Sequence, residues 1–339
     1  MTSNSADSHR HGPPSRREIL SLMLLMASSQ ITSSQDVRHD VGIAQHLRGD
    51  DTIGDLLRHP AFTGFARRLL PWDDRAYDER MKLSDIGVLL PYHSRVDVAS
   101  TIAALNRLID DRTHGRQIHF DVYTEAEKRE QPAKTNTGLF YYRGQAGAPF
   151  AVISPGGGFA YVGSVHEGFP FASEISKAGF NAFVLKYRVG LGASAATEDL
   201  ATAIAFIFRN ATALGVSTRG YSLWGSSAGA RMAAYIGSHG AVRFGGAALP
   251  KPSAVVLTYT AHSDHSAAEP PTFVAVGDQD GISPPSVMES RVNALRQMGT
   301  DVEYRIFAGV GHGFGLGIGT SAEGWIDDAI RFWTRHQSR

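Results

Sequence analysis

The sequence predicts an α/β fold built on an eight-stranded, mostly parallel, doubly wound sheet with a helical N-terminal extension. From about residue 117 onward, short apolar runs rich in β-branched and aromatic residues alternate with longer segments that have helical spacing. Hydrophobic residues make up 42% of the 339 residues, enough to bury both faces of such a sheet. Right-handed crossovers would then place the functional loops at the carboxyl ends of the strands.

Eight segments have the length and composition of strands. The first two flank a polar stretch that contains Pro132, which predicts an antiparallel pair leading into the sheet. The other six are apolar enough to be buried parallel strands. In chain order, the predicted strands are residues 118–123, 139–142, 150–154, 182–187, 221–224, 254–258, 272–276 and 302–307.

Helical segments connect the predicted strands, as crossovers between parallel strands require. They are residues 167–178, 198–214, 228–236 and 285–298. A last helix is predicted from an apolar stripe that includes Trp325 and Trp333, with Thr320 and Glu323 as a capping box at its start.

Residues 36–115 differ from the rest, because their helical patches are interrupted by prolines and no strand-like alternation occurs. The patches are residues 53–57, 62–70 and 98–109. Their apolar side chains are too few to form an independent core, so they need a partner surface. We expect a helical cap over a pocket at the carboxyl edge of the sheet. The alternative is packing on the far side or edge of the sheet for stability alone.

Residues 1–35 have the order of an export leader. Arg16 and Arg17 precede a short apolar run at residues 20–27, and a Ser-rich stretch follows. This order predicts a twin-arginine signal and a periplasmic or secreted protein. Glu18 inside the motif and the lack of a clear Ala-x-Ala cleavage site leave a cytoplasmic protein with a chance Arg-Arg pair as the alternative.

Composition argues against several classes of protein and site. Basic and acidic residues balance at 33 each, so we expect no nucleic-acid partner. Cysteine is absent, which excludes disulfides, thiolate metal sites and cysteine nucleophiles. No segment supplies the roughly 20 apolar residues of a spanning helix, so we expect no stable membrane insertion. Residues 262–265, His-Ser-Asp-His, contain ligand-type side chains without a further ligand cluster, and we predict no metal and no cofactor.

Residues 225–229, Gly-Ser-Ser-Ala-Gly, fit the pattern G-x-S-x-G, a sharp turn that exposes a serine hydroxyl. The pattern follows the predicted strand 221–224 and opens the predicted helix 228–236, which is the strand–turn–helix setting it requires. Ser227 occupies the central position and is the predicted nucleophile. Ser226 is the neighbouring alternative.

A serine hydroxyl is a poor nucleophile until a base takes its proton, so an acid and a histidine should follow the serine in that order. His312 lies in a Gly-rich loop after the predicted strand 302–307 and is the predicted base. Asp278 and Asp280 both follow the predicted strand 272–276. The residues alone leave the choice between these two carboxylates open.

Acyl transfer also needs backbone N–H donors for the negative charge that develops on the carbonyl oxygen. Residues 154–158, Ser-Pro-Gly-Gly-Gly, follow a predicted strand and supply a glycine-rich loop of this kind. We predict the amides of Gly157, Gly158 and Ala228 as the oxyanion-hole donors. A phosphate-binding loop is disfavoured, because no G-K-[ST] follows the glycines.

Together these residues resemble the acetyl esterase and hormone-sensitive-lipase-like branch of the α/β-hydrolases, especially its bacterial xylan-esterase and feruloyl-esterase-like relatives. The resemblance spans roughly residues 117–333 and includes Glu167-Gly168 after the oxyanion segment. It implies an α/β-hydrolase fold in a catalytic domain of residues 116–339. In such relatives the acid is the last residue of G-x-x-D, which here is Asp280, and Asp199 matches a structural acid of the helix after the next strand.

The resemblance implies a serine carboxylic-ester hydrolase that works through an acyl-enzyme with Ser227, His312 and Asp280. Its substrate would be a small-molecule or carbohydrate ester, such as a short acyl group on a sugar. One alternative is a serine peptidase of the same fold, although no propeller-like repeat precedes the domain. The other is a non-catalytic binding protein, although such proteins usually lose a member of the triad.

Overall fold

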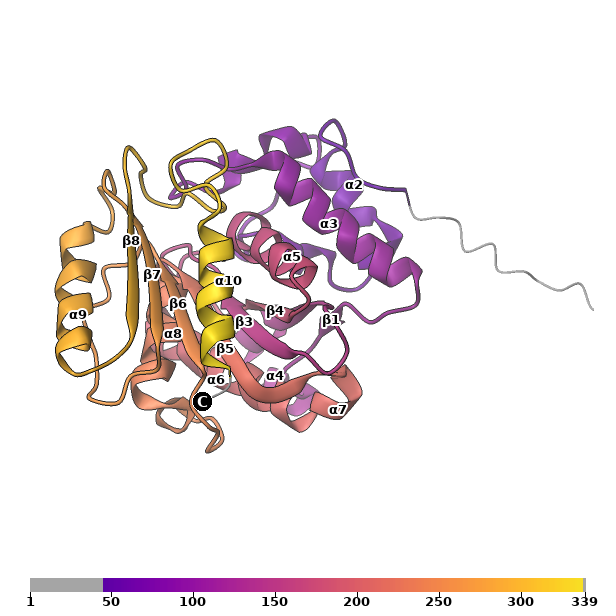
Figure 1. Cartoon of the computed structure of the whole chain (residues 1–339). Helices are drawn as coiled ribbons and strands as arrows, with labels where there is room; N and C mark the ends of the chain where they lie inside the picture. The colour runs from indigo at the N-terminus through magenta and orange to yellow at the C-terminus, as the bar shows by residue number, and fades with distance from the viewer. Residues whose placement is uncertain (1–44, 338–339) are drawn as a thin grey trace, which may run out of the picture. The chain divides into compact units, whose positions relative to one another are not determined.

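The computed structural model describes residues 45–337, which lie in one compact unit. An eight-stranded sheet forms its centre, in the order β1-β2-β4-β3-β5-β6-β7-β8 (Figure 1). The strands are β1 His119–Phe120, β2 Gly138–Tyr142, β3 Pro149–Ser154, β4 Asn181–Lys186, β5 Ser217–Ser226, β6 Ala254–Thr258, β7 Thr272–Gly277 and β8 Val302–Phe307. The predicted leader, residues 1–35, and residues 36–44 of the predicted extension lie outside the described residues.

The pairing of the strands confirms the predicted sheet. β1 pairs with β2 and β2 pairs with β4 in antiparallel fashion, whereas all other pairs are parallel. β1 is only two residues long, shorter than predicted. β5 begins four residues earlier than predicted, because Ser217 pairs with Pro149. The register then shifts through extra residues in β5, since the next pair is Ser222 with Ala151. Polar residues at a strand's start carry no periodic signal, so this part of β5 was missed.

Helices cover both faces of the sheet (Figure 1). On one face, the buried side chains of α5 and α10 share a core with Ala151 and Ile153 of β3. On the other face, those of α6, α8 and α9 share a core with Phe150 and Val152. The alternation along β3 shows the two-residue period of a strand buried on both sides. The helices of this part are α4 Glu125–Glu130, α5 Phe169–Lys177, α6 Gly192–Arg209, α7 Ala211–Leu214, α8 Ala228–His239, α9 Pro285–Gln297 and α10 Trp325–His336.

The predicted capping box of the last helix is wrong. Gly324, in the left-handed conformation with φ of +84°, stands at the N-cap of α10. The side chains of Thr320 and Glu323 are engaged in the preceding turns, where Thr320 donates to the Gly317 carbonyl and Glu323 accepts from the Gly319 amide. The tryptophans of α10 are fully buried, as the apolar stripe predicts.

The N-terminal extension packs against α5 and shares the core on that face of the sheet (Figure 1). Its segments are α2 Ile53–Arg58, the 3-10 turns η1 Pro60–Phe62, η2 Ala66–Leu69 and η3 Leu83–Leu89, and α3 Val98–Thr113. The patch predicted at residues 62–70 therefore forms 3-10 turns. Leu56 and Leu105 are fully buried in the shared core. Within its described part, residues 45–115, the extension has no core separate from that of the sheet.

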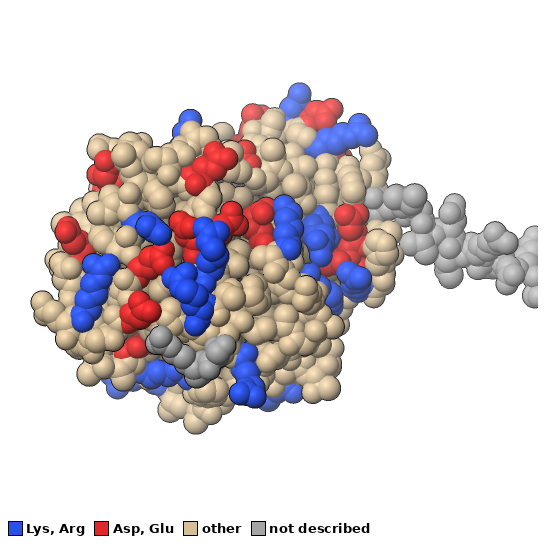
Figure 2. All heavy atoms as spheres, in the orientation of Figure 1, with Lys and Arg blue, Asp and Glu red and all other residues tan. Residues whose placement is uncertain are grey.

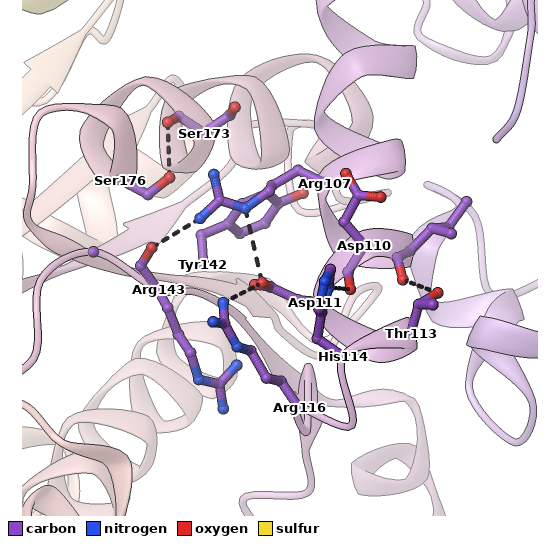
Figure 3. Close-up of polar contacts among 12 residues, drawn as sticks. Arg107, Asp110, Asp111, Thr113, His114, Arg116, Tyr142, Arg143, Ser173 and Ser176 are labelled. Carbon is purple, nitrogen blue, oxygen red and sulfur yellow. Dashed lines mark hydrogen bonds and ion pairs between the residues drawn. The ribbon is translucent and has the colours of Figure 1, made fainter. Parts of the chain in front are cut away.

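Polar contacts fasten the C-terminal end of α3 to the end of β2 (Figure 3). Buried Asp111 accepts a hydrogen bond from Arg116 at 2.8 Å, and Arg107 lies 3.8 Å from the same carboxylate. Arg107 also donates to the carbonyl of Arg143 at 3.2 Å. The hydroxyl of Tyr142 donates to a backbone carbonyl of α3 at 3.1 Å. The extension is thus attached to the rest of the protein by its apolar contacts with α5 and by these polar contacts between α3 and the end of β2.

Candidate active site

The turn between β5 and α8 presents Ser227 to a pocket. Ser227 has a φ of +50° and a ψ of −114°, a strained conformation for a residue with a side chain. A Cβ on Gly225 would lie 2.3 Å from the Gly229 carbonyl oxygen, and one on Gly229 would lie 1.9 Å from that of Ser154. Both glycines of G-x-S-x-G are therefore required by close backbone contacts. Ser226 is fully buried, and its hydroxyl accepts a hydrogen bond from Thr258.

The structure brings Ser227, His312 and Asp280 together from three loops that follow β5, β8 and β7. His312 Nε2 lies 2.9 Å from Ser227 Oγ, and His312 Nδ1 lies 2.8 Å from Asp280 Oδ2. The other oxygen of Asp280 accepts hydrogen bonds from the amides of Ile282 and Ser283. Because both carboxylate oxygens are engaged and buried, the imidazole is held with one nitrogen toward the serine.

Asp278, the other carboxylate of this loop, has a different place. It is exposed, and its Oδ1 accepts a hydrogen bond from the Gly309 amide at 2.7 Å. This contact links the loop after β7 to the loop after β8. The choice that the residues alone left open is thus made by position, because Asp280 contacts His312 and Asp278 does not.

Two of the three predicted oxyanion donors, Gly158 and Ala228, line the pocket at Ser227. Gly157 and Gly158 follow β3 with φ of +132° and +63°, values that favour glycine. Within residues 45–337, the amides of Gly157, Gly158 and Ala228 donate to no protein acceptor. Gly158, Ser227 and Ala228 line a cavity of about 240 Å³. The other lining residues are Phe159, Arg231, Thr260, Ala261, Ile282 and Ser283.

A buried carboxylate that the site prediction omitted lies behind the oxyanion segment. Glu167 is fully buried and accepts a hydrogen bond from the Gly156 amide. Burial raises the pKa of Glu167, but His93, His166 and this amide outweigh it and lower the pKa to about 2. The sequence contained one signal, since Glu167-Gly168 belongs to the segment that resembles the esterases. Nothing in the sequence pointed to His93.

Asp264 of the polar turn at residues 262–265 contacts His239 at 2.6 Å. Among residues 45–337, no group of three His, Asp or Glu side chains is placed to hold a metal ion. In the same part of the chain, no helix has the length and apolar character needed to cross a membrane. On the face drawn in Figure 2, basic and acidic side chains are interspersed.

The sheet, the crossovers and the turn at Ser227 are those of the α/β-hydrolase fold, as the resemblance predicts. Residues 141–254 match the family model BD-FAE. The matched segment includes the oxyanion glycines and Ser227 and ends before Asp280 and His312. A search of curated proteins found no match to this chain.

Solved structures agree on the fold. An α/β hydrolase enzyme from a Medee basin deep-sea metagenome library is 24% identical, with a TM-score of 0.51 over 60% of this chain and 93% of its own. An acetyl ester-xyloside bifunctional hydrolase from Caldicellulosiruptor lactoaceticus is 21% identical, with a TM-score of 0.52 over 59% of this chain and 88% of its own. A carboxylesterase from Lactobacillus plantarum is 22% identical, with a TM-score of 0.51 over 59% of this chain and 92% of its own.

These structures show the α/β-hydrolase fold. About two fifths of this chain lies outside each of the three alignments, although each neighbour is covered almost completely. This chain therefore has many residues outside the aligned fold.

Proposed function

We propose that the protein is a serine hydrolase that cleaves carboxylic esters through an acyl-enzyme. The observation that carries this proposal is the chain of contacts from Asp280 through His312 to Ser227, at 2.8 and 2.9 Å. An imidazole at hydrogen-bond distance from a serine hydroxyl, oriented by a carboxylate, is the arrangement that activates a serine nucleophile.

In the first half-reaction, Ser227 Oγ attacks the ester carbonyl carbon while its proton passes to His312 Nε2. The amides of Gly157, Gly158 and Ala228 would donate to the resulting oxyanion. When the intermediate collapses, the alcohol departs with the proton from His312, and the acyl group remains on Ser227. Water then attacks this acyl-enzyme and gives a proton to His312. When the second intermediate collapses, His312 returns that proton to Ser227 Oγ, and the carboxylic acid is released. No step requires a cofactor.

A short acyl group on a sugar or polysaccharide is the proposed substrate. The cavity beside Ser227, about 240 Å³, is small, which supports a short acyl group. The BD-FAE match and the named activity of the acetyl ester-xyloside hydrolase support an acylated carbohydrate. Hydrolysis of p-nitrophenyl acetate, longer p-nitrophenyl esters and acetylated xylo-oligosaccharides by the purified protein would rank these substrates.

Replacement of the nucleophile tests the mechanism. Ser227→Ala should lower kcat by at least about 10⁴-fold, because no neighbouring group can form the acyl-enzyme. Ser226→Ala is the matched control and should keep most of the activity. Cleavage of peptide anilides instead of esters would favour a peptidase. No turnover of any ester or anilide by folded wild-type protein would favour a binding protein.

We also propose export by the twin-arginine route, on the basis of the sequence alone. Fractionation of cells that produce the full chain would test it. The double variant Arg16→Lys/Arg17→Lys should retain the protein in the cytoplasm, because the route reads the arginine pair. Export of this variant at the wild-type level would contradict the proposal.

A further inference from the structure

One segment of the N-terminal extension, residues 92–94, reaches the loop that carries His312. The amide of Ser94 donates to the carbonyl of His312 at 3.0 Å. Next to it, Gly313 has a φ of +66°, and a Cβ there would lie 2.8 Å from the Cα of His93. The backbone of the extension therefore packs directly against the backbone of the predicted general base.

His93 lies at the centre of this contact, with a side chain only 2% exposed. Its Nε2 is 2.9 Å from Oε1 of Glu167, whose side chain is fully buried, although the angle is poor for a hydrogen bond. Its Nδ1 is 3.0 Å from the hydroxyl of Tyr161. This hydroxyl also accepts from the amide of Tyr92 at 3.2 Å, so it has a proton left to donate to Nδ1. Nε2 then carries its proton toward the carboxylate.

Glu167 connects this pair to the oxyanion segment. Its second oxygen accepts from the amide of Gly156, directly before the predicted donor Gly157. Since its pKa is lowered to about 2, the carboxylate stays ionised over the working range of an enzyme. A Cβ on Gly156 would lie 2.8 Å from Glu167 and 3.0 Å from the Cβ of Ser227. Carboxylate, oxyanion segment and nucleophile turn are thus in direct contact.

Two neighbouring bonds strengthen the same connection. Buried His166 places Nε2 3.0 Å from the carbonyl of Gly313 in the histidine loop. The hydroxyl of Thr101 in α3 donates to the carbonyl of Val165 at 2.6 Å, within the turn that carries Glu167. The oxyanion segment and the His312 loop therefore both hydrogen-bond to one group of buried side chains. This group includes Glu167 and His166, and the extension contributes His93 to it.

We propose that His93 and Glu167 are positioning residues that fix the oxyanion segment and the His312 loop relative to each other. The N-terminal extension would then contribute directly to the geometry of the active site. This inference rests on the proposed ester hydrolysis. The transition state of acyl transfer needs both the amide donors and the imidazole in place at once, and a displacement of about 1 Å costs about 100-fold in rate. Glu167 lies behind the amide donors and His93 lies against the His312 loop. Together they can set the distance between the donors and the imidazole.

The test uses three substitutions of His93 in the full-length protein. The side-chain nitrogen of His93→Gln can take the place of Nε2 and keep the contact with Glu167, whereas His93→Asn reaches only toward Tyr161. We expect kcat on p-nitrophenyl acetate to stay near wild type in His93→Gln and to fall about 100-fold in His93→Asn and His93→Ala, with KM nearly unchanged. An aryl trifluoromethyl ketone forms a hemiketal oxyanion on Ser227. Its inhibition constant should rise about 100-fold in His93→Asn and His93→Ala and stay near the wild-type value in His93→Gln.

Leu56→Ala in α2 is the control for simple destabilisation, because Leu56 is fully buried and its side chain takes part in none of the polar contacts described above. It should lower the melting temperature and leave kcat and the ketone inhibition constant unchanged well below that temperature. If His93→Ala fails to fold, the Gln and Asn variants still give the comparison.

The positioning inference is overturned if His93→Asn and His93→Ala keep wild-type kcat and ketone affinity while losing only thermal stability, as Leu56→Ala does. It is also overturned if His93→Gln is impaired as strongly as His93→Asn. The proposed function is judged separately, by wild-type turnover and the Ser227→Ala variant. A failure of one conclusion is therefore distinguishable from a failure of the other.

Discussion

Asp280 and His312 are joined across the ends of two neighbouring strands, with Oδ2 of the carboxylate 2.8 Å from Nδ1 of the imidazole. The second oxygen of Asp280 accepts two backbone amides of its own loop. Asp280 therefore cannot turn away from His312 without breaking these bonds. A carboxylate held in this way keeps the imidazole in the tautomer that accepts the serine proton.

Asp280→Asn should lower kcat by about 10⁴-fold with the fold intact, because the amide stabilises the wrong histidine tautomer. Asp278→Asn is the matched control on the same loop. Among the described residues, the side chain of Asp278 hydrogen-bonds to the Gly309 amide and not to His312, so its replacement should change kcat by a few-fold at most. Steady-state kinetics on p-nitrophenyl acetate decide between them, and equal losses in both variants would argue against the role given to Asp280.

Gly229→Ala should destabilise the protein by at least about 3 kcal/mol, because the new Cβ would collide with the Ser154 carbonyl oxygen. Gly49→Ala is the control, since its Cβ would meet only side chains at 3.9 Å. This control should change stability by no more than about 1 kcal/mol. Urea unfolding of both variants measures the difference, and a Gly229→Ala variant as stable as Gly49→Ala would show that the turn can relax.

Asp199→Ala should destabilise the protein by about 3 to 5 kcal/mol, because it leaves a buried guanidinium without its partner. Asp199 is fully buried and accepts from the backbone amide and Nε of Arg188, at 2.7 and 2.9 Å. Glu198 pairs with the same arginine at 3.2 Å but is half-exposed. Glu198→Ala should therefore cost less than about 1 kcal/mol in the same unfolding experiment. Similar losses in both would contradict the assignment of Asp199 as the structural acid.

Stability should fall as the pH is lowered from about 6.5 toward 4. Burial lowers the pKa of His166 and His262 to about 4 from the ordinary 6.5. The unfolded chain therefore takes up protons first, and each histidine removes up to about 1.4 kcal/mol per pH unit within this window. Above 6.5 the contribution is complete.

His262→Phe should reduce the slope of unfolding free energy against pH, because up to one fewer proton is taken up on unfolding. The ring of His262 packs on Tyr235, and its Nε2 has no hydrogen-bond partner among the described residues, so an apolar ring can replace it. Unfolding free energies at several pH values between 4 and 7 measure the slope. An unchanged slope in His262→Phe would mean that this histidine titrates alike in the folded and unfolded states.

Much of the fold was predictable, because its signals are local. The apolar runs of the eight strands and the helical stripes between them reflect burial on both sides of one sheet. The prediction was wrong where hydrogen bonding depends on the local path of the backbone, as at the start of the last helix. Thr320 and Glu323 have the spacing of a capping box, yet their side chains bond within the preceding turns, and Gly324 begins the helix instead.

The α/β sheet, the serine turn, and the order in which Ser227, an acid and His312 follow the fifth, seventh and eighth strands were predictable from the sequence. These features follow from hydrophobic periodicity and from residue types that a sharp turn or a proton transfer demands. The family resemblance favoured Asp280 over Asp278, but only the tertiary structure showed the contact of Asp280 with His312 and that of His93 with Glu167. Such contacts join residues 32 and 74 positions apart, and chain crossing and packing, rather than local pattern, decide which side chains meet.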